Sequence, residues 1–304
     1  MKRRNHSVIM ANAVHHIYQN TPNGYLIFYS IKDYLVFYSI VSAVARRYDV
    51  QILGICLMID HVHLVVYVQD SEQLRCFVRD YTGLFTRSYN RWYGFRGSLF
   101  NTPAGCVPKP GHKKIRTAIA YLYNNPVECH LYDRAEKARW NFLAYAAEKS
   151  PFSEKLRMDY VRWELRKALE QVKDSAKKSI PLEYTLLERI TKGLSFRELQ
   201  QLIDYIVRQY NVIDYQALIR YYGSYDNLVL AINSNTGSEY DIQEDTYAKD
   251  HRIFQKMMAL LCERRGRTMK EILSLPREQR IRTGSELKYR LGASAKDVAK
   301  LLRL

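Results

Sequence analysis

Glycine and proline are scarce in this chain of 304 residues, with 13 glycines and 8 prolines. Together they make up roughly 7% of the chain, against about 12% in average proteins. This scarcity favours long helices over a turn-rich all-β fold. Apolar runs are also short, and none reaches the roughly 18 residues of a membrane span. The basic stretch Met1–His6 is not followed by an apolar segment with a small-residue cleavage site, so no secretory signal is indicated. From these absences we expect a soluble, cytoplasmic protein.

Paired cysteines are absent as well. The chain has five cysteines, an odd number, and no C-x-x-C pair. They are widely scattered, at Cys56, Cys76, Cys106, Cys129 and Cys262. This pattern argues against a disulfide framework and against a structural zinc site.

Acidic residues are in deficit, and the formal net charge is +16. Residues 1–150 have a net charge of +9, residues 151–263 of −1, and residues 264–303 of +8. Within the first block, residues 75–116 hold nine basic side chains and a single acid, Asp80. Clustered basic charge favours a polyanionic partner such as nucleic acid, because each phosphate contact releases condensed counterions. The alternative is a generic solubilising surface.

The pattern of apolar residues in the first half indicates an α+β domain. It predicts a strand over 13–19, a helix over 31–48, strands over 50–58 and 62–68, a helix over 71–93, a loop over 94–114 and a helix over 115–124. We expect the last helix to stop near Asn125, because the residue before a proline is pushed out of the helical region. The order predicts an antiparallel sheet close to ferredoxin-like topology.

The second half is predicted to be all-helical, and Pro151 is a plausible boundary. We expect a domain over 1–150, a helical middle domain with a linker over 151–250, and a DNA-binding module over 251–304. A capping box at Ser195–Glu198 indicates a helix start, and the polar segment 233–246 is typical of a linker.

A His-x-His pair stands out in the strand predicted over 62–68 and its preceding turn. His61 and His63 are two residues apart, so on a strand they point to the same face. Two imidazoles on one face make half of a divalent-metal site. The alternative is a His-x-His pair with no role in metal binding, because such pairs are common and most of them are not ligands.

A second motif lies in the helix predicted over 115–124. Tyr121 and Asn125 are at i and i+4, on one helix face. A phenolic oxygen would then lie beside a metal ion whose coordination Asn125 completes. The alternative is a core tyrosine near a helix end, with Asn125 as a simple C-cap.

In combination these motifs resemble the single-tyrosine HUH transposases of small insertion sequences, above all their repeat-associated tyrosine transposase branch. The resemblance covers roughly residues 10–150. It is carried, in order, by His61-Val62-His63-Leu64, Thr86-Arg87-Ser88-Tyr89-Asn90, Gly97-Ser98-Leu99-Phe100 and Tyr121-Leu122-Tyr123-Asn124-Asn125-Pro126-Val127. One departure is Asp60, where the family usually has Asn.

The resemblance implies a catalytic mechanism. His61, His63 and Asn125 would hold Mg²⁺ or Mn²⁺, which polarises the scissile phosphate. Tyr121 would attack that phosphate, giving a 5′-phosphotyrosine and a free 3′-OH, and the same site could rejoin strands. Tyr123 is the rival nucleophile, but its i+4 partner is Val127, which cannot bind metal.

The resemblance also implies single-stranded DNA as the substrate. Basic side chains expected to track its phosphates are Arg75, Arg79, Arg87, Arg91, Lys113, Lys114 and Arg116. Four aromatic residues are expected either to stack on unpaired bases or to pack in the core: Tyr89, Trp92, Tyr93 and Phe95.

The C-terminal segment 281–302 is typical of a helix-turn-helix. One helix is expected to end at Gly292 and the next to be capped by Ser294, with Lys296 and Lys300 facing DNA. An ordinary helical hairpin is the alternative.

The sequence therefore predicts a metal-dependent single-stranded DNA endonuclease and strand transferase, associated with the nucleoid and binding DNA hairpins, as a monomer or homodimer. The alternative functions are a domesticated hairpin- or promoter-binding protein without cleavage, and an RNA-binding or RNA-processing protein.

Overall fold

The computed structural model describes residues 9–234 and 250–304. Its first half follows the order β-α-β-β-α-β and then adds a third helix. The elements are β1 (Ala13–Asn20), α1 (Ile31–Tyr48), β2 (Gln51–Leu57), β3 (His61–Val68), α2 (Ser71–Tyr93), β4 (Gly105–Pro108) and α3 (Gly111–Glu128). The two helices expected over 31–48 and 71–93 are confirmed at both ends.

The four strands form one antiparallel sheet in the order β2-β3-β1-β4. This order and the preceding element sequence are those of a ferredoxin-like fold, so the predicted α+β class is confirmed. The loop expected over 94–114 is wrong in part, because β4 lies within it and pairs with β1. With only four residues, two of them glycine and proline at its ends, β4 has almost no strand pattern of its own and depends on β1 for its pairing.

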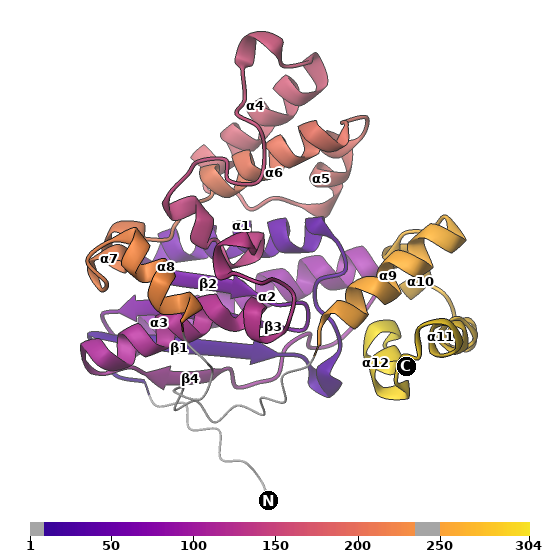
Figure 1. Ribbon diagram of the computed structural model, residues 1–304, viewed down its shortest axis with the longest axis horizontal. Helices are drawn as coiled ribbons and strands as arrows, with labels where there is room; N and C mark the ends of the chain where they lie inside the picture. Colours follow the sequence, from indigo (N-terminus) through magenta and orange to yellow (C-terminus); the bar gives the residue numbers. More distant parts are fainter. Residues whose placement is uncertain (1–8, 235–249) are drawn as a thin grey trace, which may run out of the picture.

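The two faces of the sheet carry different layers (Figure 1). Helices α1 and α2 cover one face, and α3 crosses the other. Along β3 the side chains alternate between them: Val62 and Leu64 join the core beneath α1 and α2, whereas Val65 joins the core beneath α3. By the same alternation His61 and His63 belong to the face that α3 crosses.

Helix α3 is longer than predicted, and its expected stop near Asn125 is wrong. It runs through Pro126 to Glu128, and the backbone N–H of Cys129 closes the last turn on the carbonyl of Asn125. A proline costs least where few hydrogen bonds remain to be made, and Pro126 lies in the last turn. Asn125 is therefore a helical residue and not the C-cap.

The middle segment is helical, as expected. It comprises α4 (Trp163–Lys177), α5 (Tyr184–Thr191), α6 (Phe196–Gln209), α7 (Tyr215–Arg220) and α8 (Tyr225–Asn233). The capping box at Ser195–Glu198 is present at the start of α6. Helices α5 and α6 pack on α1, and α8 packs on α3. Buried residues of α4–α6 join the same core cluster as the sheet. Most of the linker predicted over 233–246 lies outside the described residues.

The C-terminal segment comprises α9 (Arg252–Arg265), α10 (Met269–Leu273), α11 (Arg277–Leu291) and α12 (Ala295–Leu302). Helix α11 ends at Gly292, which adopts a left-handed conformation, and the hydroxyl of Ser294 caps α12 by accepting from the Asp297 N–H. The expected pair of helices joined by a short turn is therefore present. Helices α11 and α12 pack closely where they cross, because a Cβ added at Gly284 would lie 2.6 Å from Val298 Cγ1.

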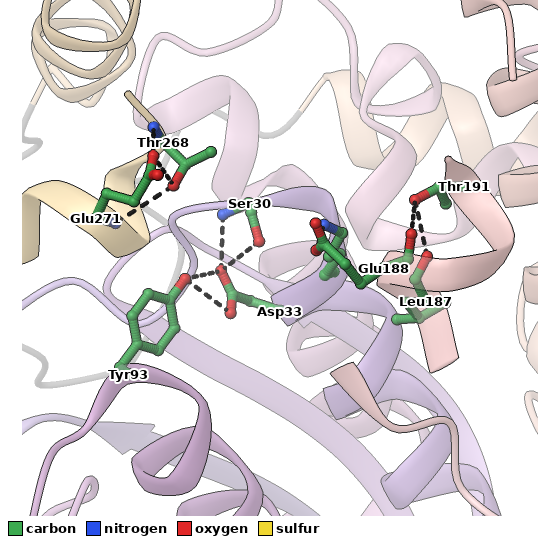
Figure 2. Close-up of polar contacts among 9 residues, drawn as sticks. Ser30, Asp33, Tyr93, Leu187, Glu188, Thr191, Thr268 and Glu271 are labelled. Carbon is green, nitrogen blue, oxygen red and sulfur yellow. Dashed lines mark hydrogen bonds and ion pairs between the residues drawn. The ribbon is translucent and has the colours of Figure 1, made fainter. Parts of the chain in front are cut away.

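A buried carboxylate joins α1 to α2 and to the middle segment. Asp33 accepts hydrogen bonds from the Ser30 N–H, the Tyr93 hydroxyl and the Tyr184 hydroxyl. Figure 2 shows Ser30 and Tyr93 around it. Burial raises the pKa of Asp33 to about 6, although the hydroxyl donors oppose that shift. This carboxylate therefore holds three separate segments together at a desolvation cost.

Candidate active site

The two histidines of β3 lie on the face of the sheet that α3 crosses. Their ring centroids are 4.9 Å apart, with the planes nearly perpendicular. His63 is fully buried, and 15% of the His61 side chain is exposed. The predicted placement of both imidazoles on one face is what the structure has.

Asn125 of α3 lies against both imidazoles. Its carboxamide oxygen is 3.2 Å from His61 Nε2, and its amide nitrogen is 3.3 Å from His63 Nε2. The Nε2 atoms of the two rings thus converge on one carboxamide. Because Asn125 is only 4% exposed, this meeting point is largely shielded from solvent.

Tyr121 lies one helical turn before Asn125 and faces the same cluster. Its ring centroid is 5.5 Å from that of His63 and 5.8 Å from that of His16, in edge-on contacts. The rival Tyr123 points elsewhere, since its buried hydroxyl donates to the Leu53 carbonyl of β2 at 3.2 Å. The structure therefore brings Tyr121, and not Tyr123, to the two histidines.

His16 of β1 was not singled out by the sequence, yet it belongs to this cluster. Its Nε2 is 2.9 Å from His63 Nδ1, and the two rings stack with centroids 5.1 Å apart. Burial lowers the pKa of His16 to about 3, with a contribution from Lys109, and burial also lowers the pKa of His63 well below its ordinary value. Both rings are therefore neutral near pH 7 in this structure.

One placement of the His63 proton satisfies both of its contacts. With His63 Nε2 accepting from the Asn125 amide, the proton is on Nδ1 and is donated to His16 Nε2. The Nε2 lone pair is then directed at Asn125. The pairing of β1 with β3 explains this contact, because Tyr18 pairs with His63 and His16 lies two residues away on the same face.

Asp60 supports His61 from the other side. Its Oδ1 is 2.7 Å from His61 Nδ1. Burial alone would raise the pKa of the Asp60 carboxyl, but His61, His251 and Lys300 outweigh burial and hold the pKa well below its ordinary value. A carboxylate that accepts the Nδ1 proton of a histidine leaves Nε2 available as a ligand, which is the usual arrangement behind metal-bound imidazole.

The donor set suits a divalent ion. Two imidazole nitrogens and one carboxamide oxygen converge, and three ligands leave further coordination positions for phosphate oxygens and water. Within residues 9–234 and 250–304 no group of three or more His, Cys, Asp or Glu side chains is placed to hold a metal ion. The candidate metal site therefore depends on Asn125 as its third ligand.

The basic side chains predicted to track DNA fall on two sides of the sheet. The arginines of α2 and the basic residues of α3 are all exposed: Arg75, Arg79, Arg87, Arg91, Lys113, Lys114 and Arg116. Because α2 and α3 cover opposite faces, only the α3 group shares a layer with Tyr121 (Figure 1). The structure does not bring the two groups together.

A groove runs along α3 beside the middle segment. It has a volume of about 650 Å³. Its lining includes Lys113, Arg116 and Thr117 of α3, and Tyr221 and Tyr222 at the end of α7. Basic and aromatic side chains together suit a nucleotide chain, which presents phosphates and unpaired bases.

The four aromatic residues of the α2 region serve as packing residues. Tyr89 and Tyr93 are buried. Trp92 stacks on Tyr184 at 5.1 Å, and the Arg303 guanidinium lies 4.6 Å from the ring centroid of Phe95. The alternative of core packing therefore holds for these rings, since their faces are already occupied within the chain.

Lys300 is buried in the protein, so the prediction that it faces DNA is wrong. Lys296 is exposed, whereas Lys300, one turn later, is only 6% exposed. The last turn of α12 docks on the first half of the chain, where Tyr29 donates to the Leu301 carbonyl and Arg303 donates to the Leu26 carbonyl. This docking covers the face of α12 that carries Lys300. Ser294 remains exposed as the N-cap.

Comparison with protein-family models agrees with the resemblance seen in the sequence. Residues 13–125 match a family model described as IS200-like transposase. One solved structure, a REP-associated tyrosine transposase bound to a REP hairpin, aligns with 46% of this chain and 80% of its own at 14% identity, with a TM-score of 0.37. The curated proteins include no match to the chain. Among the described residues, no helix is long and apolar enough to cross a membrane.

Proposed function

Residues 13–125 of the chain belong to the IS200-like transposase family, and from that premise we propose that the protein is a metal-dependent single-stranded DNA endonuclease and strand transferase. Tyr121 is its nucleophile in this proposal, and a 5′-phosphotyrosine is its intermediate. The branch to which we assign it is that of the repeat-associated tyrosine transposases, on the motifs at 61–64, 86–90, 97–100 and 121–127.

One observation carries the proposal. The Nε2 atoms of His61 and His63 converge on the Asn125 carboxamide at 3.2 and 3.3 Å, and the Tyr121 ring lies edge-on to His63. A purely structural cluster has no need to aim two imidazole nitrogens and one carboxamide at a single point next to a tyrosine. A phosphoryl-transfer site needs both a metal position and a nucleophile beside it.

The chemical step follows from these positions. The Tyr121 phenolic oxygen attacks the phosphorus, a bond forms between them, and the bond from phosphorus to the 3′ oxygen breaks. The phenol loses its proton and the departing 3′ oxygen gains one, so the step is neutral overall. The covalent link retains the energy of the phosphodiester, so a 3′-OH can later attack it and release Tyr121.

A bound Mg²⁺ or Mn²⁺ would supply charge to the scissile phosphate and to the departing oxygen. The chain's own residues prepare that position. His16 holds the proton of His63 on Nδ1, and Asp60 holds His61 by its Nδ1. Asn125 is 4% exposed and Tyr121 is 2% exposed, so bulk water has little access to either residue in this structure.

The DNA strand in this proposal follows α3. Lys113 and Arg116 line the groove beside the middle segment, on the helix that carries Tyr121. A strand lying there would place phosphates against these two side chains and bases against Tyr221. DNA hairpins, with Lys296 and Ser294 at the exposed start of α12, are proposed as the element recognised beside the single strand.

Covalent capture tests the proposal. Single-stranded oligonucleotides from both strands flanking the gene, labelled at the 3′ end, are incubated with the protein and Mn²⁺ and run on a denaturing protein gel. A 3′ label is required because the fragment that stays on the tyrosine is the one with the 5′ phosphate. We expect a labelled protein band that disappears with EDTA and in Tyr121→Phe.

Tyr123→Phe is the matched control, because Tyr123 lies two residues away on the same helix and its hydroxyl donates a hydrogen bond to the Leu53 carbonyl of β2. It should keep the labelled band. A band that survives Tyr121→Phe and is lost in Tyr123→Phe would contradict the assignment of the nucleophile. Tight hairpin binding without any covalent band would favour the alternative, a hairpin- or promoter-binding protein that does not cut.

A further inference from the structure

Asp60 lies where the C-terminal segment meets the candidate active site. Its carboxylate is 2.7 Å from His61 Nδ1 on one side, and only 12% of its side chain is exposed. Two basic side chains from the last 54 residues approach the same carboxylate. No part of the proposed phosphoryl transfer uses them.

The first of these side chains is His251, immediately before α9. It is 2% exposed, and its Nε2 is 3.7 Å from Asp60 Oδ1, within ion-pair distance. Its ring centroid is 6.1 Å from that of His61. Its backbone N–H donates to the Cys129 carbonyl at 3.2 Å, which anchors it to the end of α3. His251 is therefore held beside both Asp60 and the helix that carries Asn125.

The second is Lys300 of α12. Its stem lies against Gly24, where an added Cβ would be 3.3 Å from Lys300 Cε. The loop after Gly24 lies beside Asp60, since the N–H groups of Ile27 and Phe28 both donate to the carbonyl of Ile59. The positive charge of Lys300 contributes to lowering the pKa of Asp60 and so favours the ionised carboxylate.

We propose that His251 and Lys300 are positioning residues that hold the Asp60 carboxylate on His61, so that the C-terminal segment completes the support of the metal site. This inference rests on the proposed function only for its consequence, metal binding. The contact itself is a property of the free protein.

The physical reason is orientation. A buried carboxylate with one partner can rotate away from it. Cationic or donating groups on its other side fix the orientation of the carboxylate and offset the free-energy cost of its desolvation. An asparagine at position 60 would still accept a hydrogen bond from His61 but would carry no negative charge for Lys300 to attract. The aspartate and the two C-terminal side chains thus form one unit.

A double-mutant cycle with Mn²⁺ as the probe tests the inference. Full-length protein without DNA is titrated with Mn²⁺ in the wild type, Lys300→Met, His251→Ala, Asp60→Asn and the combinations with Asp60→Asn. Loss of an outer partner of a metal ligand typically costs 10- to 100-fold in affinity, and a partner one step further away should cost less, roughly threefold or more. We expect this loss in Lys300→Met and in His251→Ala, and no additional loss in the Asp60→Asn background.

Lys296→Met is the matched control, because Lys296 is one turn earlier on the same helix and is exposed. It should bind Mn²⁺ like the wild type. Lys300→Arg should restore most of the affinity, because it returns the charge. Thermal unfolding of each variant identifies any that has lost its fold.

A second readout does not depend on metal or on catalysis. In metal-free protein labelled with ¹⁵N-histidine, the His61 ring nitrogens report its bond to Asp60, and His61→Gln assigns them. We expect these resonances to shift in Lys300→Met and His251→Ala but not in Lys296→Met. If the wild type binds no Mn²⁺ and forms no adduct, the proposed function fails, and these shifts alone decide the inference. Unchanged His61 resonances in a folded Lys300→Met and His251→Ala, or an equal loss of affinity with and without Asp60→Asn, would overturn it.

Discussion

His16 offers the sharpest test of how the site is held together. In His16→Leu the Nδ1 proton of His63 loses the acceptor that lies 2.9 Å away in the wild type. A buried donor without a partner costs about 1–3 kcal/mol, so at pH 8 the variant should be less stable by about that amount. The imidazole of His63 would also lose the contact that fixes its tautomer, and Mn²⁺ binding should weaken by roughly 10- to 100-fold.

The pH dependence of this variant has a definite sign. In the folded, metal-free protein burial lowers the pKa of His16 to about 3, whereas in the unfolded chain its pKa is near 6.5. The unfolded state therefore takes up a proton that the folded state does not, and the stability from His16 is present above pH 6.5 and lost as pH falls towards 3. Between pH 8 and pH 5 the loss is about 2 kcal/mol for this residue, given about 1.4 kcal/mol per pKa unit.

Urea denaturation of the metal-free wild type and His16→Leu at pH 8 and pH 5 measures both effects. We expect the deficit of the variant to shrink or disappear at pH 5, because leucine does not titrate. His16→Gln is the control, since its amide can replace the lost hydrogen-bond acceptor. The reasoning is refuted if the stability difference is the same at both pH values, or if a folded His16→Leu binds Mn²⁺ as tightly as the wild type.

Three further predictions follow from other contacts. Tyr123→Phe removes the hydrogen bond to the Leu53 carbonyl and should cost about 1 kcal/mol in the free energy of unfolding; an unchanged urea midpoint would contradict it. Asp33→Asn should remove a pH dependence of stability whose sign is opposite to that of His16. The pKa of Asp33 is about 6 in the folded protein and 3.8 in the unfolded chain, so between pH 3.8 and pH 7 the wild type should lose about 3 kcal/mol of stability relative to the variant. The same denaturation series measures this loss. Lys113→Ala should reduce the slope of log affinity for single-stranded DNA against log salt by nearly one. Lys149→Ala should leave the slope unchanged, because Lys149 is exposed but does not line the groove along α3.

The sequence predicted the ferredoxin-like domain well because its strands are short apolar runs and its helices are amphipathic. Residues 62–68 form an apolar run of strand length, and the buried residues of α2 recur every three or four positions, as a helix requires. The strand β4 was missed because four residues with a glycine and a proline carry no period, and only their pairing with β1 makes them a strand. The predicted end of helix α3 was too early, because the rule for residues before proline is statistical and Pro126 falls in the last turn of the helix.

The site was predictable in so far as its residues are neighbours in the sequence. The spacing of His61 with His63, and of Tyr121 with Asn125, predicted which side chains share a face. His16 and His251 could not be found in that way, because their contacts with His63 and Asp60 depend on strand pairing and on the docking of the last helices. Lys300 was predicted to face DNA for the same reason: a helix considered alone does not say which of its faces another segment covers.

Tyr121 and Asn125 are on a single rigid helix that lies over the histidines of its own chain. In the proposed function the nucleophile and the third metal ligand are therefore placed by the same helix, on the histidines of the same chain. If a chain lacking the Tyr121 hydroxyl were mixed with a chain lacking His63, we expect no rescue of the covalent adduct in this arrangement, because neither chain would then hold a complete set of the proposed residues.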